Sequence, residues 1–279
     1  MSQAKENKSK KAPGLLKTII SNRTIIFKLA KNDFKNRFAG SYLGVFWAFV
    51  QPVITVLMYY IVFDKIFQSR SEAMAGEIPI PYVLFLTAGL VPWFFFNEGM
   101  INGMTSLIQY NYLVKKVVFN IDILPVIKVL SAGFVHVFFV LVLLIMGAVY
   151  RYYPSVYTLQ IPYYSFCLFA LILACSYATS AIVVFFKDLQ QILQIVLQLG
   201  MWATPVLWNI GKLSPKVQFI LKINPLCYVV NGYRLSICDR RWFFEDWGYT
   251  LYFWGFTLLV TWIGRVIFRK LRVYFADVL

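Results

Sequence analysis

The sequence predicts an all-α integral membrane protein. It would have six transmembrane helices, an N-terminal interfacial amphipathic helix, and a re-entrant outer helical hairpin between spans five and six. The composition gives two observations: 60% of the 279 residues are apolar and only 14% are charged, whereas a soluble domain is nearer half apolar and a quarter charged. The third is six charge-free stretches of 18 or more residues, because a spanning helix needs about 20 mostly apolar residues.

These stretches give the order of the spans. They cover residues 38–63, 78–97, 129–150, 152–186, 189–211 and 247–264. The fourth is overlong and opens with interface-type residues from Tyr152 to Pro154, so its span is expected at about 161–186. With both termini placed inside the cell, 18 of the 27 Lys and Arg lie on the inner side. The positive-inside rule therefore favours cytoplasmic termini.

Several function classes are excluded by residues that the sequence lacks. His136 is the single histidine, and no G-x-x-x-x-G-K-[ST] run is present to hold ATP phosphates. We therefore expect no catalytic residue, no metal site and no cofactor bound by this chain. Much of the net charge of +15 is accounted for by lysines beside the membrane, which attract anionic lipids of the inner leaflet. Membrane lipids, and no nucleic acid, are the expected partners of this charge.

The segment before the first span has an amphipathic pattern. Apolar residues recur at helical spacing and lysines follow a neighbouring stripe: Phe27, Ala30, Phe34 and Phe38 against Lys28, Lys31 and Lys35. This pattern predicts a basic helix lying in the inner interface. Such a helix serves as a membrane anchor, or as an anchor that also contacts a cytoplasmic partner, and the pattern alone favours the anchor.

The segment between spans two and three, residues 109–122, is long enough for two or three helical turns at the cytoplasmic surface. Its mixed polar and aromatic sequence suits docking on a soluble protein. The alternative is an ordinary loop whose Lys115 and Lys116 obey the positive-inside rule. The residues alone favour the loop.

The outer segment, residues 211–246, predicts two short helices. Ser214 precedes Pro215 and Asn224 precedes Pro225, and a capping residue before a proline at the first helical position is a helix start signal. The helices would cover about 215–222 and 225–237, each too short to cross the membrane. Both are apolar enough to dip back into it as a re-entrant hairpin. Cys227 and Cys238 lie on this outer side, and the sequence leaves their pairing open.

Positive charge exceeds negative charge in the outer hairpin by three. The residues are Lys212, Lys216, Lys222, Arg234, Arg240 and Arg241 against Asp239, Glu245 and Asp246. Together with two capped helix N-termini, this excess suits the exit of a phosphate-bearing polymer. A re-entrant plug with snorkelling lysines explains the same residues equally well.

The second span contains an aromatic run after Pro92, namely Trp93, Phe94, Phe95 and Phe96. Because proline bends a helix, these rings would offer stacking surfaces to sugars if they faced a conduit, and are packing residues otherwise. Glu98 follows, and a carboxylate within a membrane is costly enough to indicate a role or a partner. The nearest candidates by depth are Lys128 and His136.

Six sequence blocks carry a resemblance to a known family. They are GSYLGVFWAFVQP (40–52), GLVPWFFFN (89–97), FFKDLQQ (185–191), TPVLW (204–208), INPLCYVVNGYR (223–234), and WGYTLYFW (247–254) with the closing FRKLRVYFADVL. In this order the chain resembles the permease subunits of bacterial ABC-2 type exporters of polysaccharides and teichoic acids. The last pair of blocks favours the teichoic acid branch over the similar O-antigen exporters.

The resemblance implies a homodimer of this chain and two copies of a separate ABC ATPase, which would bind ATP and Mg. It implies ATPase contacts at Tyr112, Lys115 and Lys116 of a coupling helix, and at Lys28, Lys31 and Lys35. It implies a polymer path beside Trp93, Phe94, Phe95, Phe96 and Glu98. An outer gate is implied at the hairpin, with Asn224, Tyr233 and Arg234.

The expected organisation combines both lines of reasoning. It comprises a disordered basic tail (1–13), an interfacial amphipathic segment (14–40), a six-span domain (41–268) that includes the coupling segment and the outer hairpin, and a cytoplasmic C-terminal tail (269–279). The expected function is export of a polyprenyl-diphosphate-linked polymer, here teichoic acid, across the cytoplasmic membrane. The alternatives are O-antigen or capsular polysaccharide export and, from other classes, a polyprenyl-lipid transferase or a gated channel.

Overall fold

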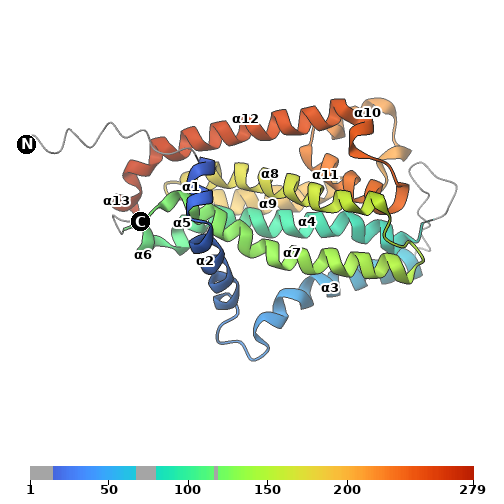
Figure 1. The fold of residues 1–279 in the computed structure, drawn as a ribbon, viewed down its shortest axis with the longest axis horizontal. Coiled ribbons are helices and arrows are strands. Elements are labelled where there is room, and N and C mark those ends of the chain that lie inside the picture. Colours follow the sequence, from blue (N-terminus) through green and yellow to red (C-terminus); the bar gives the residue numbers. More distant parts are fainter. Residues whose placement is uncertain (1–14, 67–79, 116–118) are drawn as a thin grey trace, which may run out of the picture.

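The structure is a computed structural model that describes residues 15–66, 80–115 and 119–279. In these ranges the regular elements are all helices, so the predicted all-α class is confirmed. The long helices run side by side along one axis (Figure 1). One end of this bundle carries α1, α5, α6 and α13 and is called the terminal end, while the other carries α10 and α11 and is called the hairpin end. The tail predicted for residues 1–13 lies outside the described residues.

Within the described ranges, five helical segments are long and apolar enough to cross a membrane. They are Gly44–Phe63, Tyr82–Met104, Ile121–Val149, Val156–Val183 and Phe243–Tyr274. Their main helices are α3 (Trp47–Tyr59), α4 (Tyr82–Met104), α7 (Leu124–Val149), α8 (Gln160–Val183) and α12 (Trp247–Leu271). Pro92 lies inside α4, which is one uninterrupted helix.

The fifth predicted span differs from the structure. Residues 189–211 contain α9 (Leu189–Ala203), a helix of only 15 residues, so the described residues hold five candidate spans instead of six. The helix ends because Thr204 precedes Pro205, and a residue before proline is driven to extended backbone. Thr204 has φ −91° and ψ 138° accordingly.

Short helices complete the chain. They are α1 (Leu15–Ser21), α2 (Arg23–Asn36), α5 (Ser106–Gln109), α6 (Asn111–Val114), α10 (Pro215–Lys222), α11 (Pro225–Arg234) and α13 (Phe275–Val278). The 3-10 and π turns are η2 (Gly44–Phe46), η3 (Tyr60–Ile66), η4 (Ile121–Ile123), η5 (Val156–Leu159), η6 (Ile210–Lys212), η7 (Leu235–Asp239), η8 (Phe243–Asp246) and η9 (Arg272–Tyr274). The helix starts predicted at Pro215 and Pro225 are confirmed. All four cysteines are free, Cys227 and Cys238 included.

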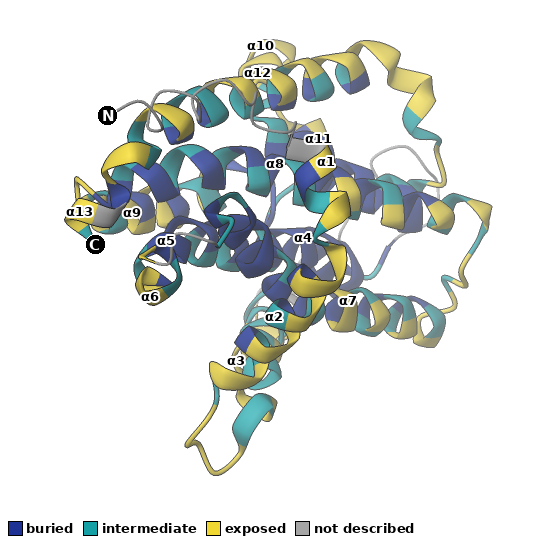
Figure 2. Cartoon of the chain, turned by 60° about the vertical axis from the view of Figure 1, so that its left-hand side comes forward, coloured by how far each residue is buried: buried dark blue, intermediate teal, exposed yellow. Residues whose placement is uncertain are grey.

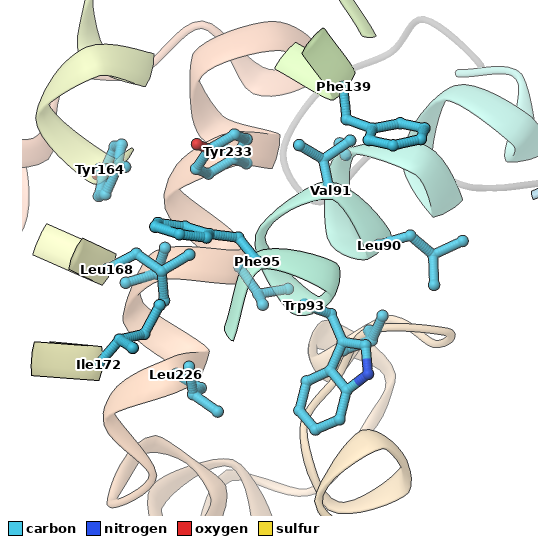
Figure 3. Close-up of a cluster of buried hydrophobic side chains, with 14 of the residues drawn as sticks. Leu90, Val91, Trp93, Phe95, Phe139, Tyr164, Leu168, Ile172, Leu226 and Tyr233 are labelled. Carbon is cyan, nitrogen blue, oxygen red and sulfur yellow. The ribbon is translucent and has the colours of Figure 1, made fainter. Parts of the chain in front are cut away.

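The core is built around α4, which packs against α7, α8 and α11. From Tyr82 to Trp93 this helix is buried on every side. Its second half approaches α8 through Gly99 and Gly103, a spacing of small residues that lets two membrane helices come close. Figure 3 shows the aromatic and aliphatic side chains of this cluster.

The contact at Gly103 leaves no room for a side chain. A Cβ there would lie 2.0 Å from Oγ of Ser176 and 2.7 Å from its Cβ. We therefore expect Gly103→Ala to force α4 and α8 apart and to cost about 1–3 kcal/mol of unfolding free energy. The check is the melting temperature of detergent-solubilised protein. Gly255→Ala on α12 is the matched control, because no atom lies within 4 Å of its added Cβ; equal melting of the two variants would contradict the expectation.

Apolar side chains cover much of the outer surface of the bundle. No residue in the 18-residue window of the α3 span is buried, and only 22% of the window in the α12 span is. In Figure 2 the outer sides of these helices are exposed or intermediate. Exposed leucines, isoleucines and aromatic rings on this scale indicate contact with lipid or with another subunit.

Candidate functional site

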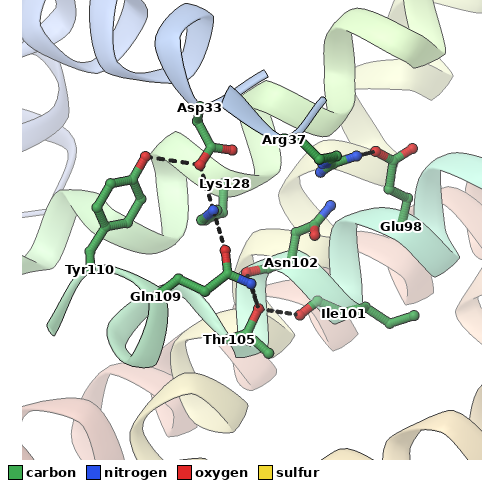
Figure 4. Close-up of polar contacts among 9 residues, drawn as sticks. All are labelled: Asp33, Arg37, Glu98, Ile101, Asn102, Thr105, Gln109, Tyr110 and Lys128. Atoms are coloured by element: carbon green, nitrogen blue, oxygen red, sulfur yellow. Dashed lines mark hydrogen bonds and ion pairs between the residues drawn. The ribbon is translucent and has the colours of Figure 1, made fainter. Parts of the chain in front are cut away.

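A cluster of polar side chains lies at the terminal end of the bundle, where α2, α4, α5 and α7 meet (Figure 4). It consists of Asp33, Arg37, Glu98, Asn102, Thr105, Gln109, Tyr110 and Lys128, and is called the polar cluster below. Asp33 and Arg37 are four residues apart at the end of α2, so both lie on the helix face that meets α4 and α7.

The centre of the polar cluster is a buried ion pair. Nζ of Lys128 donates to Oδ1 of Asp33 at 2.5 Å, and the two residues are 6% and 9% exposed. The Tyr110 hydroxyl donates to the same Oδ1 at 2.9 Å. Lys128 also donates to Oε1 of Gln109 and lies 4.9 Å from the centre of the Tyr110 ring. These contacts join α2, the α5–α6 turn and the start of α7.

Tyr110 keeps its proton in this position. It is the N-cap residue of α6 at the terminal end of the bundle, outside the candidate spans. Burial, and then the negative charge of Asp33, raise the pKa of its hydroxyl above the usual value. A raised pKa means that the neutral hydroxyl persists through the physiological pH range, so Tyr110 remains a hydrogen-bond donor to Asp33.

Glu98 pairs with Arg37 of α2. The prediction that Lys128 or His136 is the partner of Glu98 is wrong, because both side chains bind other residues. Lys128 is bound to Asp33, and His136 lies two helical turns further along α7, where Nε2 contacts the hydroxyls of Ser165 at 3.1 Å and Tyr233 at 2.9 Å. Both side chains of the Arg37–Glu98 pair are about a quarter exposed, so this pair is worth less than a fully buried one.

The residues of the polar cluster other than Thr105 line a cavity of about 530 Å³. Asn36 and Ile101 complete the lining. Among the described residues, Oδ2 of Asp33 and Nδ2 of Asn102 are buried there without a hydrogen-bond partner. The described residues hold no group of three His, Cys, Asp or Glu side chains placed to bind a metal ion. The acids and bases of the cavity are paired with one another. Such pairs are suited to fixing α2 in position against α4 and α7.

The predicted ATPase-contact residues lie beside the polar cluster and face outward. Tyr112 and Lys115 are exposed directly after Tyr110. The three lysines of α2, Lys28, Lys31 and Lys35, are exposed as well, while Lys116 lies outside the described residues. At the end of this segment Asp122 accepts from Nη1 of Arg272 at 3.0 Å, which ties it to the C-terminal helix turns.

Asp33, Gln109 and Tyr110 were missed by the sequence reasoning. The available signal was Asp33 itself, an acid between Ala30 and Phe34 on the apolar stripe of a helix. An acid on a stripe that becomes buried needs a partner. Its partner is 95 residues away in the chain, so the pattern of α2 alone does not identify it.

The structure places the aromatic run of the second span differently from the expected polymer path. Trp93 and Phe95 are 4% and 3% exposed. The Phe95 ring stacks on His136 with centroids 4.5 Å apart, and in Figure 3 it lies among Leu168 and Tyr233. Trp93 and Phe95 are core residues of this chain because α4 is enclosed by its neighbouring helices. Phe94 and Phe96 are half-buried.

The residues expected at the outer gate make hydrogen bonds inside the hairpin end, which hold its helices together. Asn224 caps α11 by accepting from the Leu226 amide at 3.0 Å and donates to Thr204 at 2.9 Å. Tyr233 bonds His136 and Ser165. The contacts with Thr204, His136 and Ser165 connect α11 to the end of α9, to α7 and to α8, respectively.

Arg234 is fully buried, with 0% exposure. Its guanidinium donates to the carbonyl oxygens of Pro205 at 2.5 Å and Val206 at 2.6 Å, and lies 3.7 Å from the centre of the Phe85 ring. The expectation that its charge adds to an outer polyanion surface is wrong for this structure, because backbone carbonyls and an aromatic ring enclose it. Arg234 instead holds the turn after α9 against α4.

Similarity to known proteins extends over nearly the whole chain. The family described as ABC-2 type transporter matches residues 24–237, from α2 to η7. A similar protein is the O-antigen export system permease protein RfbA of Myxococcus xanthus, 26% identical over 266 residues, which are 94% of this chain and 98% of that protein. The protein of the same name from Klebsiella pneumoniae is 27% identical over 256 residues, 91% of this chain and 95% of that protein.

Proposed function

Since the chain belongs to the ABC-2 type transporter family, we propose that it is the membrane-spanning permease of an ATP-driven polysaccharide exporter, with a lipid-linked O-antigen type polymer as its cargo. The cargo is inferred from the similarity to O-antigen export permeases over nearly the full length of the chain. These relatives support O-antigen export, the alternative named in the sequence analysis, in preference to teichoic acid export. The proposed location is the bacterial cytoplasmic membrane with both termini inside.

The membrane physics supports a conduit for such a cargo. A polysaccharide carries many hydroxyl groups, and each one moved into hydrocarbon without a hydrogen bond costs about 2–7 kcal/mol. A watery passage enclosed by helices removes that cost. The large apolar faces of α3, α9 and α12 provide surfaces on which a second copy and the lipid would pack, so the proposed assembly is a homodimer with two ATPase subunits.

We propose that α9 completes a sixth crossing in this assembly. Its 15 residues extend over about 22 Å. The residues from Thr204 to Asn209 follow it mostly in turns and bends and reach about 20 Å only if the assembly draws them out. Together they exceed the thickness of about 30 Å of the hydrocarbon core. Six crossings place both ends of the chain on one side.

The polar cluster is proposed to carry motion from the ATPase to the spans. Tyr112 and Lys115 present an exposed surface to a partner, and the neighbouring Tyr110 is bonded to Asp33 of α2. A displacement of α6 therefore moves α2 and α7 with it, because the buried Lys128–Asp33 pair resists separation. ATP and Mg act in the partner subunit.

Recovery of an ATPase subunit tests this assignment. We expect Lys115→Glu to reduce the amount of ATPase that co-purifies with the chain by about tenfold, equal to about 1.4 kcal/mol, because a reversed charge at an interface is repelled. The measurement is quantitative pull-down from detergent-solubilised membranes. Lys216→Glu at the hairpin end is the control, since Lys216 is also an exposed lysine but lies far from the α6 surface. Unchanged recovery with Lys115→Glu would contradict the docking surface, and no ATPase with the unmodified chain would contradict the function.

A further inference from the structure

A second pocket, of about 570 Å³, lies at the hairpin end. It is enclosed by α8, α10, α11, η8 and the start of α12, which converge at this end of the bundle in Figure 1. Its volume lies in the range of about 300–1,000 Å³ typical of pockets for small molecules. Neither the proposed ATPase contact nor the polar cluster involves it.

Aromatic rings form much of the wall of this hairpin-end pocket. They come from Tyr164, Tyr228, Trp242, Phe243 and Tyr249. The ring of Tyr228 meets Tyr249 edge to face with centroids 5.2 Å apart, and the Trp242 ring is stacked on Phe244 at 5.4 Å. Both arrangements hold the rings in fixed orientations. Flat rings fixed in a wall provide the surfaces on which the C–H face of a pyranose packs.

Two polar atoms of the pocket residues lack partners. Asn231 lines the pocket and is only 8% exposed, and its Oδ1 accepts no hydrogen bond from any described residue. The hydroxyl of Tyr249 is likewise buried and unbonded in the described part of the chain. A buried polar atom without a partner costs about 1–3 kcal/mol. A ligand that supplies hydroxyl groups would recover this cost once the Asn231 and Tyr249 side chains turn toward the pocket.

The charges of the pocket balance. Lys222 and Arg241 oppose Glu245 and Asp246. Each acid already accepts a hydrogen bond from a backbone amide. Oε1 of Glu245 accepts from the Trp242 amide at 2.9 Å, and Oδ1 of Asp246 accepts from the Tyr249 amide at 3.2 Å. The acids are therefore fixed in place with acceptor capacity left over. Two donors and two acceptors of opposite charge suit a neutral polyhydroxyl ligand better than a phosphate, which the acids would repel.

We propose that the hairpin-end pocket binds one neutral pyranose ring of the exported polymer. The identification of that ring with the cargo rests on the proposed function, whereas the binding of a pyranose to the pocket does not. A pocket of this kind beside the outer helices retains a sugar unit after it has crossed. The balanced charge is also a reason to expect uncharged sugars in the cargo, in contrast to a polyol phosphate.

The test is saturation-transfer NMR on the full chain in lipid nanodiscs. The probes are the methyl pyranosides of glucose, galactose and mannose, with glycerol 3-phosphate as the anionic comparison. We expect saturable transfer from at least one pyranoside and none from glycerol 3-phosphate. Trp242→Ala and Tyr249→Phe should each weaken the pyranoside affinity by fivefold or more. Trp247→Ala, an exposed tryptophan at the start of α12 that does not line the pocket, should leave the affinity unchanged.

Two outcomes would overturn the pocket assignment. One is no saturable binding of any pyranoside to the unmodified chain, and the other is equal binding by Trp242→Ala and Trp247→Ala. Competition by glycerol 3-phosphate would overturn the neutral-ligand assignment. ATP-dependent export by the reconstituted transporter separates this proposal from the proposed function, because export with no pyranoside binding refutes the pocket alone.

Discussion

Lys128→Met is expected to destabilise the protein by about 3–5 kcal/mol, because it leaves the Asp33 carboxylate buried without a counter-charge. The substitution removes hydrogen bonds to two segments, α2 and α5, at the same time. The measurement is thermal unfolding of the solubilised protein. Arg37→Met is the control, because the Arg37–Glu98 pair is partly exposed and such pairs contribute about 1 kcal/mol or less.

A double variant separates stability from coupling. Asp33→Leu with Lys128→Met removes both charges, and replacing a buried pair by apolar residues is often neutral for stability. We expect this variant to melt near the unmodified protein but to lose ATP-driven export, because the tie between Tyr110 and α2 is gone. Normal export by the double variant would show that the pair serves stability alone.

Arg234→Ala is expected to remove folded protein from the membrane, with a loss of about 2–5 kcal/mol. It opens a cavity and leaves the carbonyl groups of Pro205 and Val206 without their donor. Arg234→Lys should rescue little, since a single ammonium does not reproduce the planar fork that binds two carbonyls.

The measurement for Arg234 is the amount and melting temperature of protein in isolated membranes. Arg240→Asn is the control, because Arg240 is an exposed cation on the same segment and its positive φ of 53° is tolerated by asparagine. Full recovery of Arg234→Ala with loss of export only would instead assign the guanidinium to the polymer.

Local rules predicted much of the fold. The starts of α10 and α11 follow from Ser214–Pro215 and Asn224–Pro225, and the structure has both helices where these signals put them. The early end of α9 was also encoded locally, by Thr204 before Pro205. It was overlooked because the absence of charge from 189 to 211 was taken as one continuous helix.

The polar contacts could not be predicted in the same way. Glu98 was recognised as needing a partner, but Arg37 is 61 residues away. From the sequence, Arg234 is counted with Arg240 and Arg241 among the outer positive charges of the hairpin. Its burial depends on Phe85 and on the segment after α9 coming together in three dimensions. Periodicity shows which face of a helix is apolar, and it does not show which distant residue will cover that face.

The sequence separation within the polar cluster also constrains the order of biogenesis. Asp33 and Lys128 are 95 residues apart, and a ribosome adds about 5–20 residues per second, so α2 waits roughly 5–20 s for its cation to be synthesised. During that interval the Asp33 carboxylate has no Lys128 to pair with. The contact that ties α2 to α7 therefore forms only after the second candidate span and the start of the third have been synthesised.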